Sequence, residues 1–151
     1  MADDARRLRD RGARRGKAWS LAQVCEHLAL AVQGTVDLPS PDSPSCDPPE
    51  WWRRLNPLVR LQRRVMKRGL LWSGMFPKGV PSPKFVTPSD SAELDAAIEK
   101  LASAATAFDR KHAQAGARWV YHPLLGPMTG PQWKRFHDLH ARHHFKFIKS
   151  E

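Results

Sequence analysis

The sequence predicts an all-α fold: a four-helix bundle with a long Pro-rich crossover between the second and third bundle helices. Three observations carry this prediction. Apolar residues recur at helical spacing over long segments, strand signals are almost absent, and proline-rich stretches separate the segments. The chain has 151 residues and a hydrophobic fraction of 41%, which suits one domain with a real core. We therefore expect residues 1–151 to form a single domain.

The first two helices differ in character. Residues 1–16 are strongly basic, and 3–15 predict only a short, weak helix with a tendency to fray. Ser20 is a good N-cap for a second helix that runs to about Thr35. This helix carries an apolar stripe, and His27 lies at the edge of that stripe.

The middle of the chain is interrupted by proline. Six of the 13 prolines fall between Pro39 and Pro57, which predicts an irregular crossover. The range 58–71 predicts a short basic helix, and 72–86 predicts a loop.

The third bundle helix is expected to begin at Thr87-Pro88-Ser89-Asp90. This run offers a threonine cap, a proline at the first helical position and an acid at the third. Apolar residues at coiled-coil-like spacing follow, and the helix should continue to about Ala115, with Gly116 as its stop.

The last helix holds a cluster of histidines. It should begin near Pro131, with Thr129 as its cap. Four of the chain's seven histidines follow within eight residues: His137, His140, His143 and His144. The i, i+4 spacing of His140 and His144 stacks their side chains on one face, where both imidazoles can reach one metal ion.

A helical projection indicates where this face points. At about 100° per residue, one sector holds the apolar side chains together with two histidines: Trp133, Phe136, His140, His144 and Phe147. His140 then falls near the middle of the apolar stripe. An unpaired polar group in a core costs about 1–3 kcal/mol, so we expect a partner for these imidazoles.

Two histidines alone make a weak site, because catalytic zinc generally uses three protein ligands and an open position. His27 is the best third candidate, since bundle sites are built from facing helices. His112 competes, but it stands near a helix C-terminus, where the helix dipole favours a cationic histidine without any metal. For each histidine the alternative is a hydrogen-bonded core residue without a metal.

The remaining histidines have expected supporting roles. His122 precedes Pro123 in a turn and should bond to nearby backbone. His137 is flanked by charge and His143 lies at the stripe edge, so each is either a supporting hydrogen-bond donor or a surface residue. No carboxylate stands out as a general base, because Glu26 should point away from its neighbouring histidine and Asp138 lies on the polar face.

The excess of basic residues in the chain has two possible interpretations. The formal net charge is +10, with seven basic residues between positions 6 and 17 and seven more between 53 and 68. Such clusters can bind nucleic acid or another polyanion. Because no helix-turn-helix, zinc-finger or RNA-binding aromatic pattern accompanies them, we favour solvated helix faces over nucleic-acid binding.

The sequence also bears on where in the cell the protein is located. Cys25 and Cys46 do not suggest a disulfide framework. The basic N-terminus followed by an apolar run resembles a secretory signal, but Glu26 and His27 interrupt the run. No segment approaches the roughly 20 apolar residues of a membrane span. We expect a cytoplasmic protein with no membrane partner.

The order WSLAQVCEHLALAVQG, a proline-containing crossover and HPLLGPMTGPQWKRFHDLHARHHFKFI resembles the DinB/YfiT-like superfamily, and within it an uncharacterised branch that is a domain of unknown function. The resemblance covers about residues 15–149. It implies a four-helix bundle whose divalent metal is held by His27, His140 and His144. It also implies thiol-dependent transfer chemistry with small thiols such as mycothiol or bacillithiol. The basic first helix and Phe147, where many relatives carry glutamine, depart from the pattern.

The leading hypothesis is thus a metal-dependent enzyme, with Zn or Ni on the three histidines and a small-molecule substrate undergoing thiol transfer or hydrolysis. A non-catalytic basic bundle that binds nucleic acid or another polyanion is the alternative. A third possibility is a metal that serves stability alone. A homodimer is consistent with the short first helix and with spare aromatic residues at Trp51, Trp52 and Trp72.

Overall fold

The computed structural model describes residues 1–10, 13–15, 19–38, 50–76, 83–113, 120–122 and 124–150, which are mostly helical. The α-helices are α1 (Ala2–Asp10), α2 (Leu21–Val36), α3 (Glu50–Arg53), α4 (Pro57–Ser73), α5 (Leu94–Phe108) and α6 (Gly130–Phe145). A 3-10 turn, η2, spans Lys84–Val86, and a π-helical turn, η3 (Asp109–Ala113), follows α5.

Short antiparallel strands accompany the helices. Strand β1 (Ala13–Arg15) pairs with β4 (Lys149–Ser150), and β2 (Val120–His122) pairs with β3 (Gly126–Met128). The expectation of an all-α chain is therefore wrong in this respect. The segments are two or three residues long, too short to show the alternation by which strands are recognised in a sequence.

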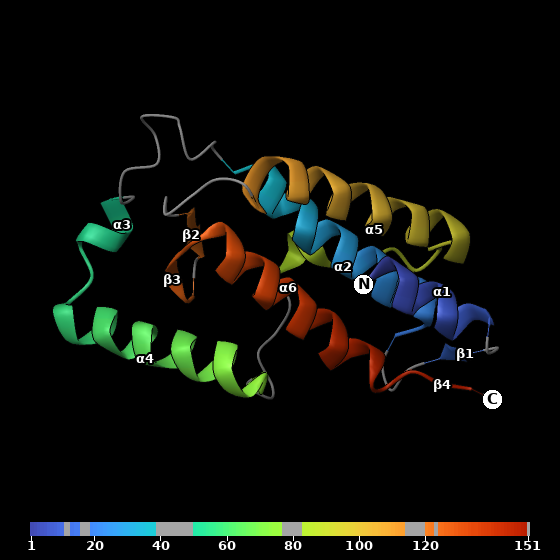
Figure 1. The fold of residues 1–151 in the computed structure, drawn as a ribbon, viewed down its shortest axis with the longest axis horizontal. Helices are drawn as coiled ribbons and strands as arrows, with labels where there is room; N and C mark the ends of the chain where they lie inside the picture. The colour runs from blue at the N-terminus through green and yellow to red at the C-terminus, as the bar shows by residue number, and fades with distance from the viewer. Residues whose placement is uncertain are drawn as a thin grey trace.

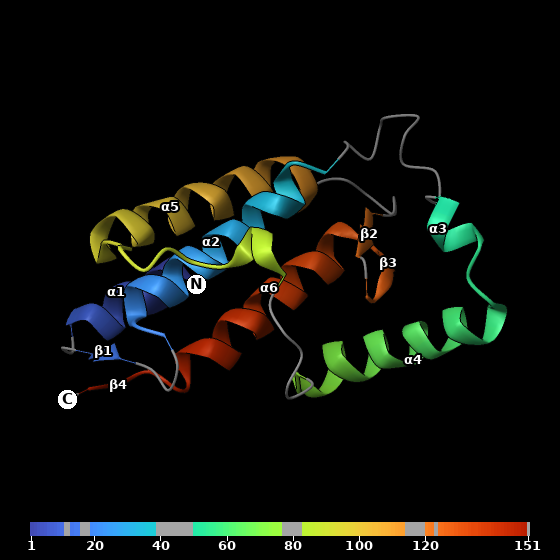
Figure 2. The same cartoon turned by 180° about the vertical axis from the view of Figure 1, so that it is seen from behind.

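The helices form a layered arrangement around α6. Helices α2 and α5 pack along each other, α1 lies against both, and α6 packs on α2 (Figure 1). Seen from either side, α6 lies between the α2–α5 pair and α4 (Figure 2). Helix α4 contacts α6 and β3. None of the helices in the described ranges is long and apolar enough to cross a membrane.

Two buried clusters of apolar side chains hold these layers together. The first joins α1, α2, α5 and the end of α6, and its largest fully buried members are Leu21, Leu28, Ile98 and Leu101. The second joins the other ends of α2, α5 and α6 to the β2–β3 hairpin through Val32, Phe108, Met128 and Trp133. Burial of such side chains contributes roughly 1.5–3 kcal/mol each, and it fixes α6 against α2.

The predicted starts of α2 and α6 are confirmed. The Ser20 hydroxyl accepts the backbone N–H of Gln23, whose side chain accepts the N–H of Ser20 in return. Thr129 and Gln132 form the same reciprocal pair at α6. Each capping box satisfies two N–H groups that a helix start leaves unpaired.

The predicted start of the third long helix at Thr87 is wrong. Helix α5 begins at Leu94, and Glu93 occupies its N-cap position without a side-chain cap bond. The backbone N–H of Ser89 donates instead to the Glu26 carboxylate of α2, at 2.7 Å. This tertiary bond holds the segment before α5 against α2. The predicted end of this helix at Ala115 and Gly116 lies outside the described residues.

Other boundaries also differ from the expectation. Helix α1 ends at Asp10, and 13–15 pair as a strand instead of continuing the helix. Helix α3 occupies 50–53, at the end of the stretch expected to be irregular; 39–49 lie outside the described residues. Helix α4 extends the predicted basic helix to Ser73 and ends at Gly74, whose φ of 69° is the left-handed conformation that favours glycine.

A substitution at Gly126 tests the packing between α3 and the β2–β3 hairpin. Its φ is +76°, and a Cβ at this position would collide with the indole of Trp52. We expect Gly126→Ala to destabilise the protein by about 2 kcal/mol or more, because strain and overlap add. Chemical denaturation measures this. The matched control is Gly69→Ala in α4, where a Cβ meets no atom within 4 Å; there alanine should stabilise by about 0.5–1 kcal/mol. Equal effects at both glycines would contradict the packing described.

Candidate metal centre

Three histidines from two helices converge at one point. His27 comes from the middle of α2, and His140 and His144 lie one turn apart on α6. The Nε2 atoms of His27 and His140 are 3.3 Å apart, and those of His140 and His144 are 3.0 Å apart. One ligand nitrogen from each of the three lies within 4.8 Å of the others. The structure thus brings together the three residues that the sequence selected.

Backbone from η2 fixes the orientation of His27. Its Nδ1 lies 2.8 Å from the carbonyl oxygen of Val86. A carbonyl can only accept, so Nδ1 carries the proton and donates it. Because burial lowers the pKa of His27, the ring is neutral, and its Nε2 presents a lone pair to His140.

The three rings cannot satisfy one another while neutral. The Nε2 of His140 lies close to two other Nε2 atoms, and a neutral imidazole nitrogen either donates or accepts. If the Nε2 of His140 carries a proton, it can donate that proton to His27 or to His144 but not to both, and it has no lone pair with which to accept from the remaining ring. If it accepts from His144, its lone pair faces the lone pair of His27. At most one of the two contacts is therefore a full hydrogen bond.

A single metal ion held by these residues would resolve this conflict. Ligand nitrogens at 2.0–2.1 Å from zinc are about 3.3–3.4 Å apart in tetrahedral geometry. The spacings of 3.3 and 3.0 Å found here are close to that value. One cation would accept all three lone pairs at once. The three histidines could therefore hold a metal ion.

Electrostatics keep these rings in the form that binds metals. Burial, together with neighbouring His27 and His143, lowers the pKa of His144 to about 4. Burial lowers the pKa of His140 well below its ordinary range, and the surrounding histidines add to the effect. At neutral pH the imidazoles are therefore uncharged, with one ring nitrogen free of a proton, as metal ligation requires.

Aromatic rings pack against the candidate ligands. The indole of Trp19 stacks on His144, with ring centres 6.0 Å apart, and lies tilted 4.9 Å from His27. Phe76 stacks on His140, with ring centres 5.4 Å apart. These walls lower the local dielectric and restrict access of water. Neither residue was selected from the sequence, although Trp19 occupies the position before an N-cap where an apolar side chain usually packs on its own helix.

The predicted centre of the α6 face is wrong. The buried residues of α6 are Gly130, Trp133, His137, Leu139, Ala141 and Phe145. His140 is only half-buried at the edge of this face, and Phe147 is 42% exposed beyond the helix end. Phe136, which the helical projection places in the apolar sector, is only partly buried: it packs against the edge of the second cluster and against Phe76 from the loop after α4.

His137 is a core residue that links α6 to α2. It is 3% exposed, which excludes the surface role considered for it. The Thr35 hydroxyl donates to the Ala31 carbonyl, so it accepts the Nε2–H of His137 at 3.1 Å. The ring also stacks on Trp133. His137 therefore supports the position of α6 beside the three candidate ligands.

The other histidines differ in their surroundings. His122 turns its Nδ1 to the backbone N–H groups of Leu124 and Leu125, at 3.0 and 3.2 Å, which confirms the expected backbone role. His143 is half-buried and contacts Phe76 and His144 through its ring. The side chain of His112 lies outside what the structure describes.

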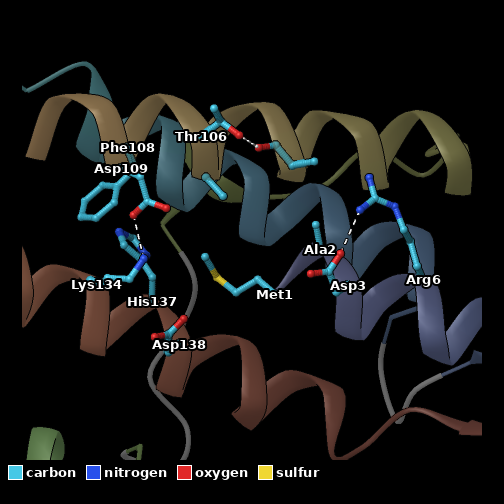
Figure 3. A pocket seen from close by; sticks show the side chains of 12 residues that line it. Met1, Ala2, Asp3, Arg6, Thr106, Phe108, Asp109, Lys134, His137 and Asp138 are labelled. Carbon is cyan, nitrogen blue, oxygen red and sulfur yellow. Dashed lines mark hydrogen bonds and ion pairs between the residues drawn. The ribbon is translucent and has the colours of Figure 1, made fainter. Parts of the chain in front are cut away.

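The carboxylates near these residues have other partners or lie elsewhere. Glu26 binds Lys100 and the backbone of Ser89, so it does not face the site. Asp138 lines a cavity of about 300 Å³ between α1, α5 and α6 (Figure 3). His137 also lines it, but none of the three candidate ligands does. Two ion pairs lie among its lining residues, Lys134 with Asp109 at 2.7 Å and Arg6 with Asp3 at 3.1 Å.

His122 provides a test of the electrostatics. Burial lowers its pKa from 6.5 to about 4, so its contribution to stability is full above pH about 6.5 and is lost as the pH falls towards 4. In His122→Asn the amide oxygen can accept the same two N–H groups but does not titrate. We expect the loss of unfolding free energy across this window to shrink by about 1–3 kcal/mol.

Denaturant titrations at a series of pH values measure this difference. The control is the stability above pH about 7, which should stay near that of the unsubstituted protein because both bonds are kept. An unchanged slope between the two pH limits would mean that His122 titrates normally in the folded state.

Comparison with known proteins gives a family but no activity. The family model described as "Protein of unknown function (DUF1569)" matches residues 1–151. No curated protein and no solved structure matches the chain. Because the match spans the whole chain, this protein belongs to the DUF1569 family, whose function is unknown.

Proposed function

We propose that this chain is a DinB-like four-helix-bundle protein that holds a divalent transition metal on His27, His140 and His144. One observation carries the proposal: in a group of three neutral imidazoles from two helices, the Nε2 atoms of His27 and His144 lie 3.3 and 3.0 Å from the Nε2 of His140. A purely structural core would avoid this arrangement, because it leaves a lone pair unsatisfied. An all-imidazole donor set of this kind suits Zn or Ni.

The protein's own residues prepare the site for such an ion. The Val86 carbonyl holds the His27 ring in one tautomer, and burial lowers the pKa of all three rings and so keeps them uncharged. Trp19 and Phe76 cover the rings and restrict water. A bound divalent ion would supply Lewis-acid chemistry, lowering the pKa of a water or thiol ligand towards neutrality.

The reaction we favour is metal-dependent thiol transfer on a small molecule, with hydrolysis as the other candidate. The resemblance to DinB-like proteins supports this choice, and the apolar, aromatic surroundings of the histidines suit a thiol better than a highly charged substrate. With three protein ligands, a position remains for a substrate or a small thiol.

Metal binding is the direct test of the site. Untagged protein should take up about one equivalent of Zn or Ni and melt at a higher temperature when loaded, because the ion binds only the folded state. Replacing His27, His140 or His144 with Gln should each weaken binding by about a hundredfold or more, since losing a ligand costs at least as much as losing its supporting bonds. Elemental analysis and calorimetry measure both quantities.

His143→Gln is the matched control. It removes a half-buried histidine of the same helix that does not belong to the converging group, so affinity should stay near that of the unsubstituted protein. Less than about a tenth of an equivalent of any transition metal in folded, reconstituted protein would refute the site.

The enzymatic part needs its own test. Metal-loaded protein is incubated with an electrophile and a small thiol such as bacillithiol or mycothiol, and free thiol is followed over time. Metal-dependent thiol consumption that His140→Gln abolishes and His143→Gln retains is the expected result. Tight metal binding without turnover of any thiol or hydrolysable substrate would instead assign the ion to stability alone.

A further inference from the structure

Helix α4 carries a row of exposed apolar side chains on its outward face. Leu58, Leu61, Val65 and Trp72 follow one another at intervals of three, four and seven residues, which places them on one side of α4, and Met75 lies just beyond the end of the helix. Their exposed fractions are 72%, 57%, 63%, 88% and 74%. We call these five residues the α4 stripe. Single exposed apolar residues are ordinary, but a continuous row of large ones marks an interaction surface.

The opposite face of α4 is firmly attached to the rest of the molecule. Leu70 is buried, and Lys67 donates from its buried ammonium to the Pro127 carbonyl of β3 at 2.5 Å. Arg60 donates to the carbonyls of Leu55 and Arg53. These contacts hold α4 in place, so the stripe residues remain exposed in the folded protein.

The charges on α4 indicate what chemistry the stripe fits. Residues 57–73 include Arg60, Arg63, Arg64, Lys67 and Arg68, and no acidic residue. Two of these cations, Arg64 and Arg68, are exposed beside the stripe. The occupant must therefore accept apolar side chains and supply negative charge at their border.

A second copy of this helix meets the first requirement but not the second. Pairing two such stripes would bring Arg64 and Arg68 of both copies to one interface, with no acidic residue on either helix to compensate them. Nucleic acid has the opposite shortcoming. Its phosphates would suit the two arginines but would leave Leu61, Val65 and Trp72 against a charged backbone.

An anionic lipid surface meets both requirements. The acyl boundary takes up Leu, Val and Trp side chains, while arginines at the border reach the phosphates. Helix α4 lies at the periphery of the fold (Figures 1 and 2), and the residues of its stripe are exposed. A membrane needs no complementary groove to receive them. A helix of 17 residues is about 25 Å long and can lie flat in the interface.

We propose that α4 docks this protein on anionic membrane surfaces through the α4 stripe, with Arg64 and Arg68 at the lipid headgroups. The proposal is independent of the metal site. It departs from the expectation of no membrane partner, which considered only spanning segments. Interfacial binding requires no span.

Co-sedimentation with lipid vesicles tests this. The whole protein should bind vesicles of equal parts phosphatidylglycerol and phosphatidylcholine, bind phosphatidylcholine alone at least about tenfold more weakly, and dissociate as salt rises. Leu61→Ser with Val65→Ser, and separately Arg64→Gln with Arg68→Gln, should each lower binding by about tenfold or more. Because all four side chains are exposed, circular dichroism should show unchanged folding.

Phe85→Ser is the matched control, since Phe85 is 70% exposed on η2 and lies outside the stripe; it should leave binding unchanged. Trp72 supplies a second readout without loss of apolar surface: vesicles should shift the tryptophan emission to shorter wavelength, and Trp72→Phe should remove most of the shift.

Three results would overturn the proposal. The first is absence of binding to the phosphatidylglycerol vesicles, or equal loss of binding with Phe85→Ser. The second is a dimer in solution that Leu61→Ser with Val65→Ser dissociates, which would make a second copy the occupant. The third is nucleic-acid binding that depends on the two arginines but not on Leu61 and Val65.

Discussion

Three neutral imidazole nitrogens share a space in which they cannot all be satisfied by one another. His27 has its proton committed to the Val86 carbonyl, and the Nε2 of His140 cannot bond fully to both of its neighbours. A fold keeps such an arrangement only if surrounding packing enforces it or a cation relieves it. The capped helix starts, the η2 turn and the aromatic rings of Trp19 and Phe76 all help to position these three histidines.

Both local sequence and tertiary packing determine the arrangement of the three histidines. Capping boxes at Ser20 and Thr129 fix where α2 and α6 begin, and so which residues of each helix face the other. The apolar clusters then set how the two helices lie together. Tethers from α2 to the segment before α5, made by Glu26 and His27, bring the Val86 carbonyl into position. Together these contacts set the relative positions of the three ligand nitrogens.

The sequence predicted the parts of this site that depend on local periodicity. The i, i+4 pair of His140 and His144, the capped starts of α2 and α6, and His27 as a residue facing across from α2 are all local patterns or simple consequences of them. The centre of the α6 face was not predictable in this way. Helix α6 packs against elements on two sides, so His137 enters the core while Phe136 and His140 lie against Phe76, which comes from beyond α4.

Long-range contacts also explain the errors in the helix boundaries. The run from Thr87 to Asp90 has every local feature of a helix start, yet α2 binds its backbone through Glu26 and α5 begins later. The Val86 carbonyl and the ring of Trp19 reach the histidines through the fold alone. A sequence can therefore identify ligand candidates, but not the groups that orient and cover them.

The proposed metal centre consists of one ion held by the imidazoles of His27, His140 and His144. X-ray absorption at the zinc edge of protein loaded with one equivalent of Zn tests it most directly, because imidazole rings add characteristic scattering beyond the first shell. We predict a first shell of nitrogen and oxygen at about 2.0–2.1 Å, with outer-shell scattering from three imidazoles. A sulfur shell near 2.3 Å, or a spectrum without imidazole scattering, would contradict the account.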